Sequence, residues 1–338
     1  MAKNVTLAKR TEMNLDEKLL DAIGIQTIRS SSKPSARKDT ASQDGYANKG
    51  STKQASDIKF FIPDKSLFQP MEKPGRGDWL KEHKESGQTY KHFVSARGAI
   101  GSYRGPNPLR STIYLLPLVF REDPVPPEVM SPLQQFASIF FGMPVTVLKP
   151  VCLRGKVADR LNGEVYQAHA GDILDKMRAH LKRDAFCVAG ITLADLYPKE
   201  AWNFVFGLAN MTTNCGVYSL ARYLSNFGSH ETTQIDLEQD SLRSILIRAC
   251  KTMCHEIGHV FGLRHCIYFK CLMNGSNHLA ESDSRPNFLC PVCLRKLHHA
   301  CAFDIVERYQ AMRKFWEDQG VPHLTEWLDR RLAGLGAA

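Results

Sequence analysis

The segment at residues 254–275, CHEIGHVFGLRHCIYFKCLMNG, concentrates side chains that bind metals. His255 and His259 stand four residues apart, so on a helix their imidazole rings lie on one face and can share one ion. Glu256 projects beside that ion and is placed to hold a water molecule rather than to coordinate the metal. The pattern indicates metal-assisted hydrolysis; the alternative is a surface helix that carries histidines and binds no metal.

A third histidine completes the first set of ligands. Gly262 follows His259 by three residues, where a left-handed residue can end the helix and turn the chain back. His265 can then return to the same ion as His255 and His259. Three neutral imidazoles and one water predict a tetrahedral zinc with an open position, which is the catalytic arrangement rather than the closed structural one.

Four cysteines beside these histidines predict a second site. They form two pairs separated by a loop: Cys266, Cys271, Cys290 and Cys293. Four thiolates make a closed tetrahedral zinc site without room for water, so this zinc is expected to be structural. A disulfide between Cys290 and Cys293, buried thiols without metal, and a zinc ribbon that binds nucleic acid remain as alternatives.

The histidine and cysteine motifs together resemble the archaemetzincin family of zinc metalloproteases, within the metzincins. The combined motif is H-E-x-x-H-x-x-G-x-x-H-C, then four residues, C-x-M, sixteen residues and C-x-x-C. Flanking segments such as DAFCVAGITLADLYP and WNFVFG are similar to those of animal members, and the resemblance covers roughly residues 78–327. It implies two Zn2+ ions per chain and an aminopeptidase-like activity on peptide or protein substrates. It assigns the three histidines and four cysteines as zinc ligands, Glu256 as the general base and Met273 as the Met-turn residue that forms an apolar floor under the histidines.

This assignment leads to two expectations about chemistry. Glu256 takes a proton as water attacks the scissile carbonyl and passes it to the leaving amine. The cysteine zinc holds His265 in place through its neighbour Cys266, so loss of Cys290 should loosen the catalytic ion. The rival function is a zinc-stabilised, non-catalytic module that binds a partner or nucleic acid, for which neither Glu256 nor an open zinc position is needed.

The elements that must position these residues follow from hydrophobic patterning. Strands are expected at 111–120, 144–151, 185–198 (with a loop after it), 202–210 and 216–223, and helices at 126–142, 170–181, from about 240 to 262, and over the last forty residues. Alternating strands and helices, followed by strands alone and one long helix, predict an α+β or mixed α/β fold with a twisted mixed sheet backed by helices. The resemblance makes this a metzincin-like zincin fold, in which 202–210 or 216–223 forms the sheet edge that an extended peptide joins.

The chain divides into three parts by composition. Residues 1–60 are polar and are expected to be disordered, except that Leu15, Leu19 and Ile23 are spaced for a small docking helix at 14–23. Residues 61–108 are mixed and irregular, and residues 109–338 form the metallopeptidase domain with its four-cysteine zinc site.

Targeting signals and charge bear on location and partners. The sequence lacks an apolar secretory signal and any stretch long enough to span a bilayer, so we expect a cytosolic or nuclear protein with reduced thiols and no membrane partner. The formal net charge is +9, but the first sixty residues carry 11 basic and 7 acidic side chains. We therefore do not expect nucleic acid as a partner, and the sequence makes no prediction about the oligomeric state.

Three further histidines and four further cysteines are expected to have no metal role. His278, His298 and His299 are predicted to be surface or supporting residues. Four further cysteines lie on the long helix or in apolar strands and are predicted to be buried: Cys152, Cys187, Cys250 and Cys254.

Overall fold

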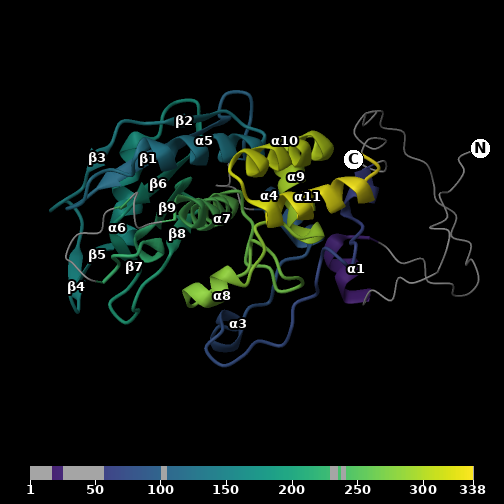
Figure 1. The fold of residues 1–338 in the computed structure, drawn as a ribbon, viewed down its shortest axis with the longest axis horizontal. Coiled ribbons are helices and arrows are strands. Elements are labelled where there is room, and N and C mark those ends of the chain that lie inside the picture. Colours follow the sequence, from purple (N-terminus) through teal and green to yellow (C-terminus); the bar gives the residue numbers. More distant parts are fainter. Residues whose placement is uncertain (1–16, 26–56, 100–104, 229–234, 237–240, 338) are drawn as a thin grey trace, which may run out of the picture.

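The computed structural model describes residues 17–25, 57–99, 105–228, 235–236 and 241–337. Its larger sheet is mixed and six-stranded and lies toward the left in Figure 1. The strand order is β2-β1-β6-β9-β8, with β3 also pairing with β1. The bounds are β1 Thr112–Val119, β2 Val145–Val147, β3 Val151–Cys152, β6 Ala185–Thr192, β8 Gly207–Asn210 and β9 Cys215–Ser219. All pairings are parallel except that of β8 with β9, so β8 is an antiparallel edge strand. The predicted mixed α/β fold is confirmed.

Two apolar layers cover this sheet because its central strands alternate their side chains between the faces. Ile113 and Leu115 of β1 join the larger core, whereas Leu116 and Leu118 join a smaller core on the other face. The larger core contains α5 (Pro127–Phe141) and α7 (Leu242–Val260), and the smaller one contains α6 (Ala170–Met177), which is followed by the 3-10 helix η2 (Arg178–His180). A further 3-10 helix, η3 (Ala221–Tyr223), follows β9.

The long helix α7 begins where its sequence predicts. Ser241 is the N-cap and its side chain accepts a hydrogen bond from the Ser244 backbone N–H. Buried residues on α7 include Ile245, Ala249 and Met253, which join the larger core. His255 and His259 of the same helix are only partly buried, so their rings lie on a more open side.

A second, three-stranded sheet was not predicted from the sequence. Its strands are β4 (Asp159–Asn162), β5 (Val165–His169) and β7 (Asp195–Tyr197), in that order. The β4 strand is polar and mostly exposed, and residues 195–197 were expected to belong to the strand at 185–198 or the loop after it. Strand β7 pairs in parallel with β5, which is distant in sequence, so only the tertiary fold reveals the pairing.

Helices at the C-terminal end close the domain; the last two were predicted from the sequence, and the first two were not (Figure 1). They are α8 (Leu279–Asp283), α9 (Pro291–Cys301), α10 (Ile305–Asp318) and α11 (Pro322–Gly334). Trp316 of α10 is fully buried and packs on Phe136 of α5, with ring centroids 5.0 Å apart. None of the helices in the described ranges is long and apolar enough to cross a membrane.

The N-terminal part of the chain packs against the C-terminal helices. Its helices are α1 (Glu17–Ile23), the 3-10 helix η1 (Asp57–Phe61), α3 (Trp79–Glu82) and α4 (Tyr90–Ala99). Within the expected docking helix at 14–23, the described residues are helical; Leu19 and Ile23 are buried, and Arg295 of α9 donates to the Ile23 carbonyl at 2.7 Å. The disorder predicted for most of the first sixty residues concerns positions outside the described ranges.

Candidate metal centres

The structure brings His255, His259 and His265 together at the end of α7. Gly262 has φ of +88°, so the chain leaves the helix through a left-handed residue and returns His265 to the face that carries the other two. The Nε2 atoms of His255 and His259 are 3.0 Å apart, and one ring nitrogen from each of the three lies within 4.8 Å of the others. Zn–N bonds of about 2.0–2.1 Å in a tetrahedral site require comparable separations, so this donor set fits zinc.

Each of these rings is oriented by a hydrogen bond at its other nitrogen. His255 Nδ1 lies 2.9 Å from the Leu272 carbonyl oxygen, and His259 Nδ1 lies 2.7 Å from that of Leu263. A carbonyl only accepts, so each Nδ1 is the donor and each Nε2 keeps its lone pair for a metal. Burial lowers the pKa of His259 to about 3 and that of His255 well below its usual value, with neighbouring histidines adding to the effect. Both rings are therefore neutral, which is the metal-binding form.

Glu85 holds the third histidine, and sequence reasoning missed it. Its Oε1 accepts from His265 Nδ1 at 2.7 Å and from Trp79 Nε1 at 2.6 Å. Burial alone would raise the pKa of Glu85, but the hydrogen bond and charge of His265 and the hydrogen bond of Trp79 lower it, so the carboxylate is ionised at neutral pH. Glu85 lies 180 positions before His265 in a loop, so no local pattern signals this contact.

Glu256 lies between α7 and the edge strand β8. A Cβ added at Gly207 would come within 2.5 Å of Glu256 Oε1, so the β8 backbone passes directly beside the carboxylate. Glu256 is 6% exposed, and burial raises its pKa to about 8, so without a nearby cation most of this side chain is protonated at neutral pH. A zinc ion held by the three histidines would favour the ionised form that a general base needs. Among the described residues it has neither a hydrogen-bond nor an ion-pair partner, which leaves the carboxylate available to water or substrate in the cavity.

Met273 packs against α7 at Gly258, a residue that lies between His255 and His259 in the sequence. It is fully buried, and a Cβ at Gly258 would come within 2.8 Å of its Sδ. Its carbonyl accepts from the Cys266 backbone N–H at 2.8 Å, which joins the turn to the chain just after His265. Met273 therefore packs on the turn of α7 that carries His255 and His259, and its role as a floor beneath the histidines stays a prediction.

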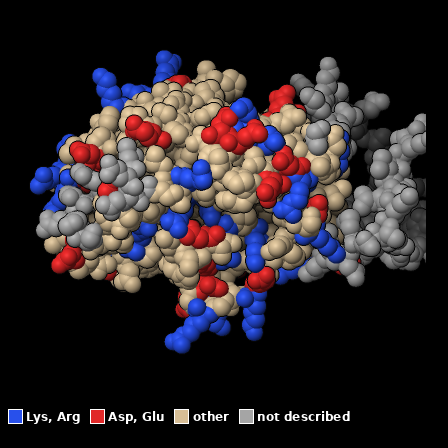
Figure 2. Space-filling view, in the orientation of Figure 1, with Lys and Arg blue, Asp and Glu red and all other residues tan. Residues whose placement is uncertain are grey.

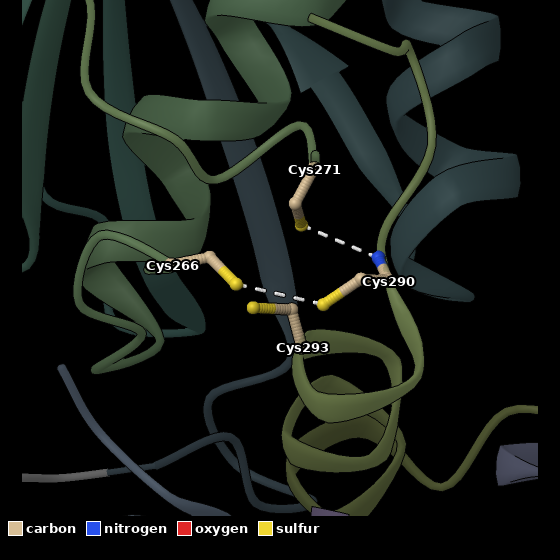
Figure 3. A group of neighbouring side chains, drawn as sticks. All are labelled: Cys266, Cys271, Cys290 and Cys293. Atoms are coloured by element: carbon tan, nitrogen blue, oxygen red, sulfur yellow. Dashed lines mark hydrogen bonds between the residues drawn. The ribbon is translucent and has the colours of Figure 1, made fainter. Parts of the chain in front are cut away.

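The four cysteines point toward one centre in Figure 3. All are buried free thiols, and their Sγ atoms lie within 4.8 Å of one another. Cys266 Sγ and Cys290 Sγ are 3.6 Å apart, and a tetrahedral zinc with Zn–S bonds of about 2.3 Å requires about 3.8 Å between sulfurs. No disulfide joins Cys290 and Cys293, so that alternative is wrong in this structure.

The surroundings of the cysteines favour thiolates. Backbone N–H groups of Cys290 and Met273 donate to Cys271 Sγ at 3.2 and 3.4 Å. Cys290 caps α9 and Cys293 lies in its first turn, where the positive end of the helix dipole stabilises negative sulfur. Hydrogen bonds from the other cysteines lower the pKa of Cys266, whereas burial raises the pKa values of Cys271 and Cys290. A bound cation would therefore be needed to ionise all the thiols. This buried donor set fits a closed zinc site.

Asn274, also missed from the sequence, braces the loop between the two sites. Its Oδ1 accepts from the Cys271 N–H at 2.7 Å, and its Nδ2 donates to the carbonyls of Cys266 and Phe269 at 2.7 and 2.9 Å. Because Cys266 directly follows His265, this side chain couples the geometry of the cysteine cluster to that of the histidine cluster.

A cavity of about 560 Å³ opens beside the histidines and Glu256. Trp79 packs against the backbone at Gly275, where a Cβ would meet its ring at 2.5 Å. The Trp79 and His265 rings meet edge to face at 5.0 Å, and Trp202 stacks on His83 at 5.4 Å. Segments around 79–85 and 198–206 thus form aromatic walls that no periodicity in the sequence indicates.

A third group of potential ligands, Asp78, His278 and Glu281, has a structural use. Glu281 is buried, accepts from the Trp79 N–H at 3.0 Å and pairs with Arg285 at 2.5 Å. His278 is exposed and caps α8 by accepting from the Glu281 N–H at 3.1 Å. These bonds hold α3 against α8, which lie near each other in Figure 1.

Of the four other cysteines predicted to be buried, Cys187, Cys250 and Cys254 are buried. The prediction for Cys152 is wrong, because its side chain is exposed. Strand β3 has only two residues and pairs with the last residues of β1, Leu118 and Val119, where the chain leaves the sheet.

Comparison with known proteins agrees with this geometry. The model of peptidase family M54 matches residues 144–299. Archaemetzincin-2 of Rattus norvegicus is 40% identical over 283 residues, with 77% of each chain covered, and archaemetzincin-2 of Homo sapiens is 38% identical over the same length and coverage. A solved archaemetzincin from Methanopyrus kandleri is 28% identical and covers 59% of this chain and 99% of that chain, with a TM-score of 0.46.

The two donor groups and the sequence similarities define a zinc-dependent metallopeptidase. The alignments with these two relatives cover more than two thirds of each relative's length, at about 40% identity. The chain belongs to the archaemetzincin family.

Proposed function

We propose that the chain hydrolyses peptide bonds with Glu256 as the general base. The observation that carries this proposal is the position of Glu256: it lines the same cavity as the three histidines and has no structural partner among the described residues. A buried carboxylate without a partner is costly to fold, so its retention beside a metal site supports a chemical role.

The roles of the other residues follow from the same geometry. His255, His259 and His265 would hold a catalytic zinc, which polarises the scissile carbonyl and lowers the pKa of water when bound. Glu256 accepts a proton from the attacking water and delivers it to the leaving amine as the C–N bond breaks. Met273 supports the histidines from below, and the four cysteines would hold a second, structural zinc.

We propose that the substrate lies along β8 as an added strand. Gly207, Leu208 and Ala209 of β8 line the cavity, and the strand forms the edge of the sheet, with one side unpaired in the described sheet. An extended peptide can form backbone hydrogen bonds with such an edge. It would then place a scissile bond beside Glu256, because Gly207 contacts that carboxylate.

Aminopeptidase-like cleavage is the finer proposal, and family resemblance supports it. The lining of the cavity adds no further support. Glu256 is its one carboxylate among the described residues, so the α-ammonium group of a substrate N-terminus would compete with the attacking water for Glu256. Paired peptides with free and acetylated N-termini test this specificity: an aminopeptidase cleaves only the free form, and equal cleavage would contradict the proposal.

We also propose peptide or protein substrates and a cytosolic or nuclear location. All ten cysteines are free thiols, which is consistent with a reducing compartment. On the face shown in Figure 2, basic and acidic side chains of the described residues are interspersed and form no continuous basic surface, which argues against nucleic acid as the partner.

The test of the proposed function is chelator-sensitive cleavage of a diverse peptide library, with Glu256→Gln as the isosteric variant. We expect Glu256→Gln to lose activity by roughly 100-fold to 10,000-fold while keeping both zinc ions. Hydrolysis at the parent rate by a pure, fully zinc-loaded Glu256→Gln protein would show that Glu256 is not the base.

A further inference from the structure

The cavity extends along α7 to Lys251, one helical turn before His255. Lys251 lines the cavity and is only 7% exposed. Its Nζ donates to the carbonyl oxygens of Ser282 and Arg285 at 2.9 and 2.7 Å. An ammonium group has three N–H donors, so one remains without a partner among the described residues.

The charge of Lys251 is not neutralised by a nearby carboxylate. Asp283 pairs with Arg248 at 2.7 Å, and Glu281 pairs with Arg285 at 2.5 Å. Within the described ranges no carboxylate lies within 4 Å of Lys251 Nζ. Burial lowers the pKa of Lys251 to about 8; the positive charges of Arg248 and Arg285 also lower it, and Asp283 opposes them. The side chain is therefore mostly charged at neutral pH, and a buried cation of this kind gains from an anionic partner.

The rest of the cavity has the same charge bias. Three other cationic side chains line it, namely Lys199, Arg264 and Arg285, whereas Glu256 is the one carboxylate among its described lining residues. One helical turn rises about 5.4 Å, which is comparable to one or two residues of an extended peptide at about 3.3 Å each. A group that reaches Lys251 therefore belongs to a residue close to the scissile bond.

We propose that Lys251 forms a subsite that binds a substrate carboxylate on the α8 side of the scissile bond. The carboxylate is either an Asp or Glu side chain or a free C-terminus, since both present the same acceptor. This inference rests on the proposed peptidase function and adds a substrate class to it.

A structural role for Lys251 makes a different prediction. Ser282 lies in α8 and Arg285 just beyond it, so Lys251 also satisfies carbonyls at the end of that helix. If this were the whole role of Lys251, its loss would lower kcat/KM for acidic and neutral substrates by the same factor. A carboxylate subsite instead changes the ratio between acidic and neutral substrates.

The first experiment measures kcat/KM for matched peptides that differ by Glu against Gln at each position near the cleaved bond, and by a C-terminal carboxylate against an amide. We expect one acidic member to be preferred by roughly 10-fold to 100-fold, the range for one hydrogen bond between charged groups. The two pairs distinguish side chain from C-terminus. Lys251→Met should abolish the preference, and Lys182→Met, the same change at an exposed lysine that does not line the cavity, should retain it.

A second measurement separates this inference from the proposed function. In zinc-loaded Glu256→Gln protein, calorimetry compares binding of the Glu and Gln peptides with and without the added Lys251→Met change. Tighter binding of the acidic peptide that disappears with Lys251→Met supports the subsite even if the parent cleaves no peptide. The subsite proposal would be overturned if proteins that retain Lys251 cleaved and bound acidic and neutral peptides equally. If such proteins still hydrolysed peptides, the proposed peptidase function would stand without the subsite.

Discussion

Removing the Glu85 carboxylate should weaken zinc at the histidine site without unfolding the protein. Glu85 is the only described carboxylate that bonds His265, and the 2.7 Å contact joins an ionised carboxylate to a ring N–H. Loss of such a supporting partner typically costs 10-fold to 100-fold in metal affinity. That corresponds to about 1.4–2.7 kcal/mol. Glu85→Gln keeps a neutral acceptor, so its loss of zinc affinity should be near the lower limit of this range. Glu85→Ala removes the acceptor, so its loss of zinc affinity should be near the upper limit.

The assay is zinc competition with a chromophoric chelator, in which the cysteine site acts as an internal reference. We expect the parent to release its two zinc ions in two steps, and Glu85→Ala to release the weaker one at roughly 10-fold to 100-fold lower chelator concentration. Glu82→Gln, a change at an exposed glutamate of the adjacent helix α3, is the matched control and should behave as the parent.

Two outcomes would refute the reasoning. If Glu85→Ala retained both ions with parental affinity, the contact with His265 would have no energetic weight. If both sites lost zinc together, Glu85 would act on the fold as a whole rather than on His265. Retention of the cysteine zinc with selective loss of the other ion is the result that the geometry requires.

Three further predictions concern the site. Cys290→Ser should remove the cysteine zinc and also weaken the catalytic ion, because Cys266 adjoins His265; two ions retained with normal affinity would rule this coupling out. Gly207→Ala should lower kcat by 10-fold or more, since its Cβ would lie 2.5 Å from Glu256 Oε1, whereas Gly216→Ala, with contacts no closer than 3.6 Å, should be nearly neutral in the same assay. The preference for acidic peptides should decline as the pH rises through about 8, because Lys251 then loses its proton, and the ratio of kcat/KM for the Glu and Gln peptides measures it; a ratio constant from pH 6 to 10 would exclude Lys251 as the source.

Much of the fold could be predicted because its signals are local. The apolar runs of β1, β6 and β9 and the amphipathic α5 and α7 follow periodicities that a short window reveals. The polar strand β4 and the three-residue β7 carry no such signal and depend on pairing with β5. The prediction that Cys152 is buried was wrong for a related reason, because an apolar run in the sequence does not show where a sheet ends.

The sequence by itself determined which residues gather at the two candidate metal centres. Helical spacing places His255 and His259 on one face, Gly262 permits the turn, and the four cysteines are paired along the chain, so the proximity within each pair is local. Tertiary structure alone decided what surrounds them. Glu85 reaches His265 across 180 positions, and the pairing of Arg248 and Arg285 with nearby carboxylates leaves Lys251 facing the cavity without a counterion. Such contacts depend on how distant segments pack, and no spacing within a single segment encodes them.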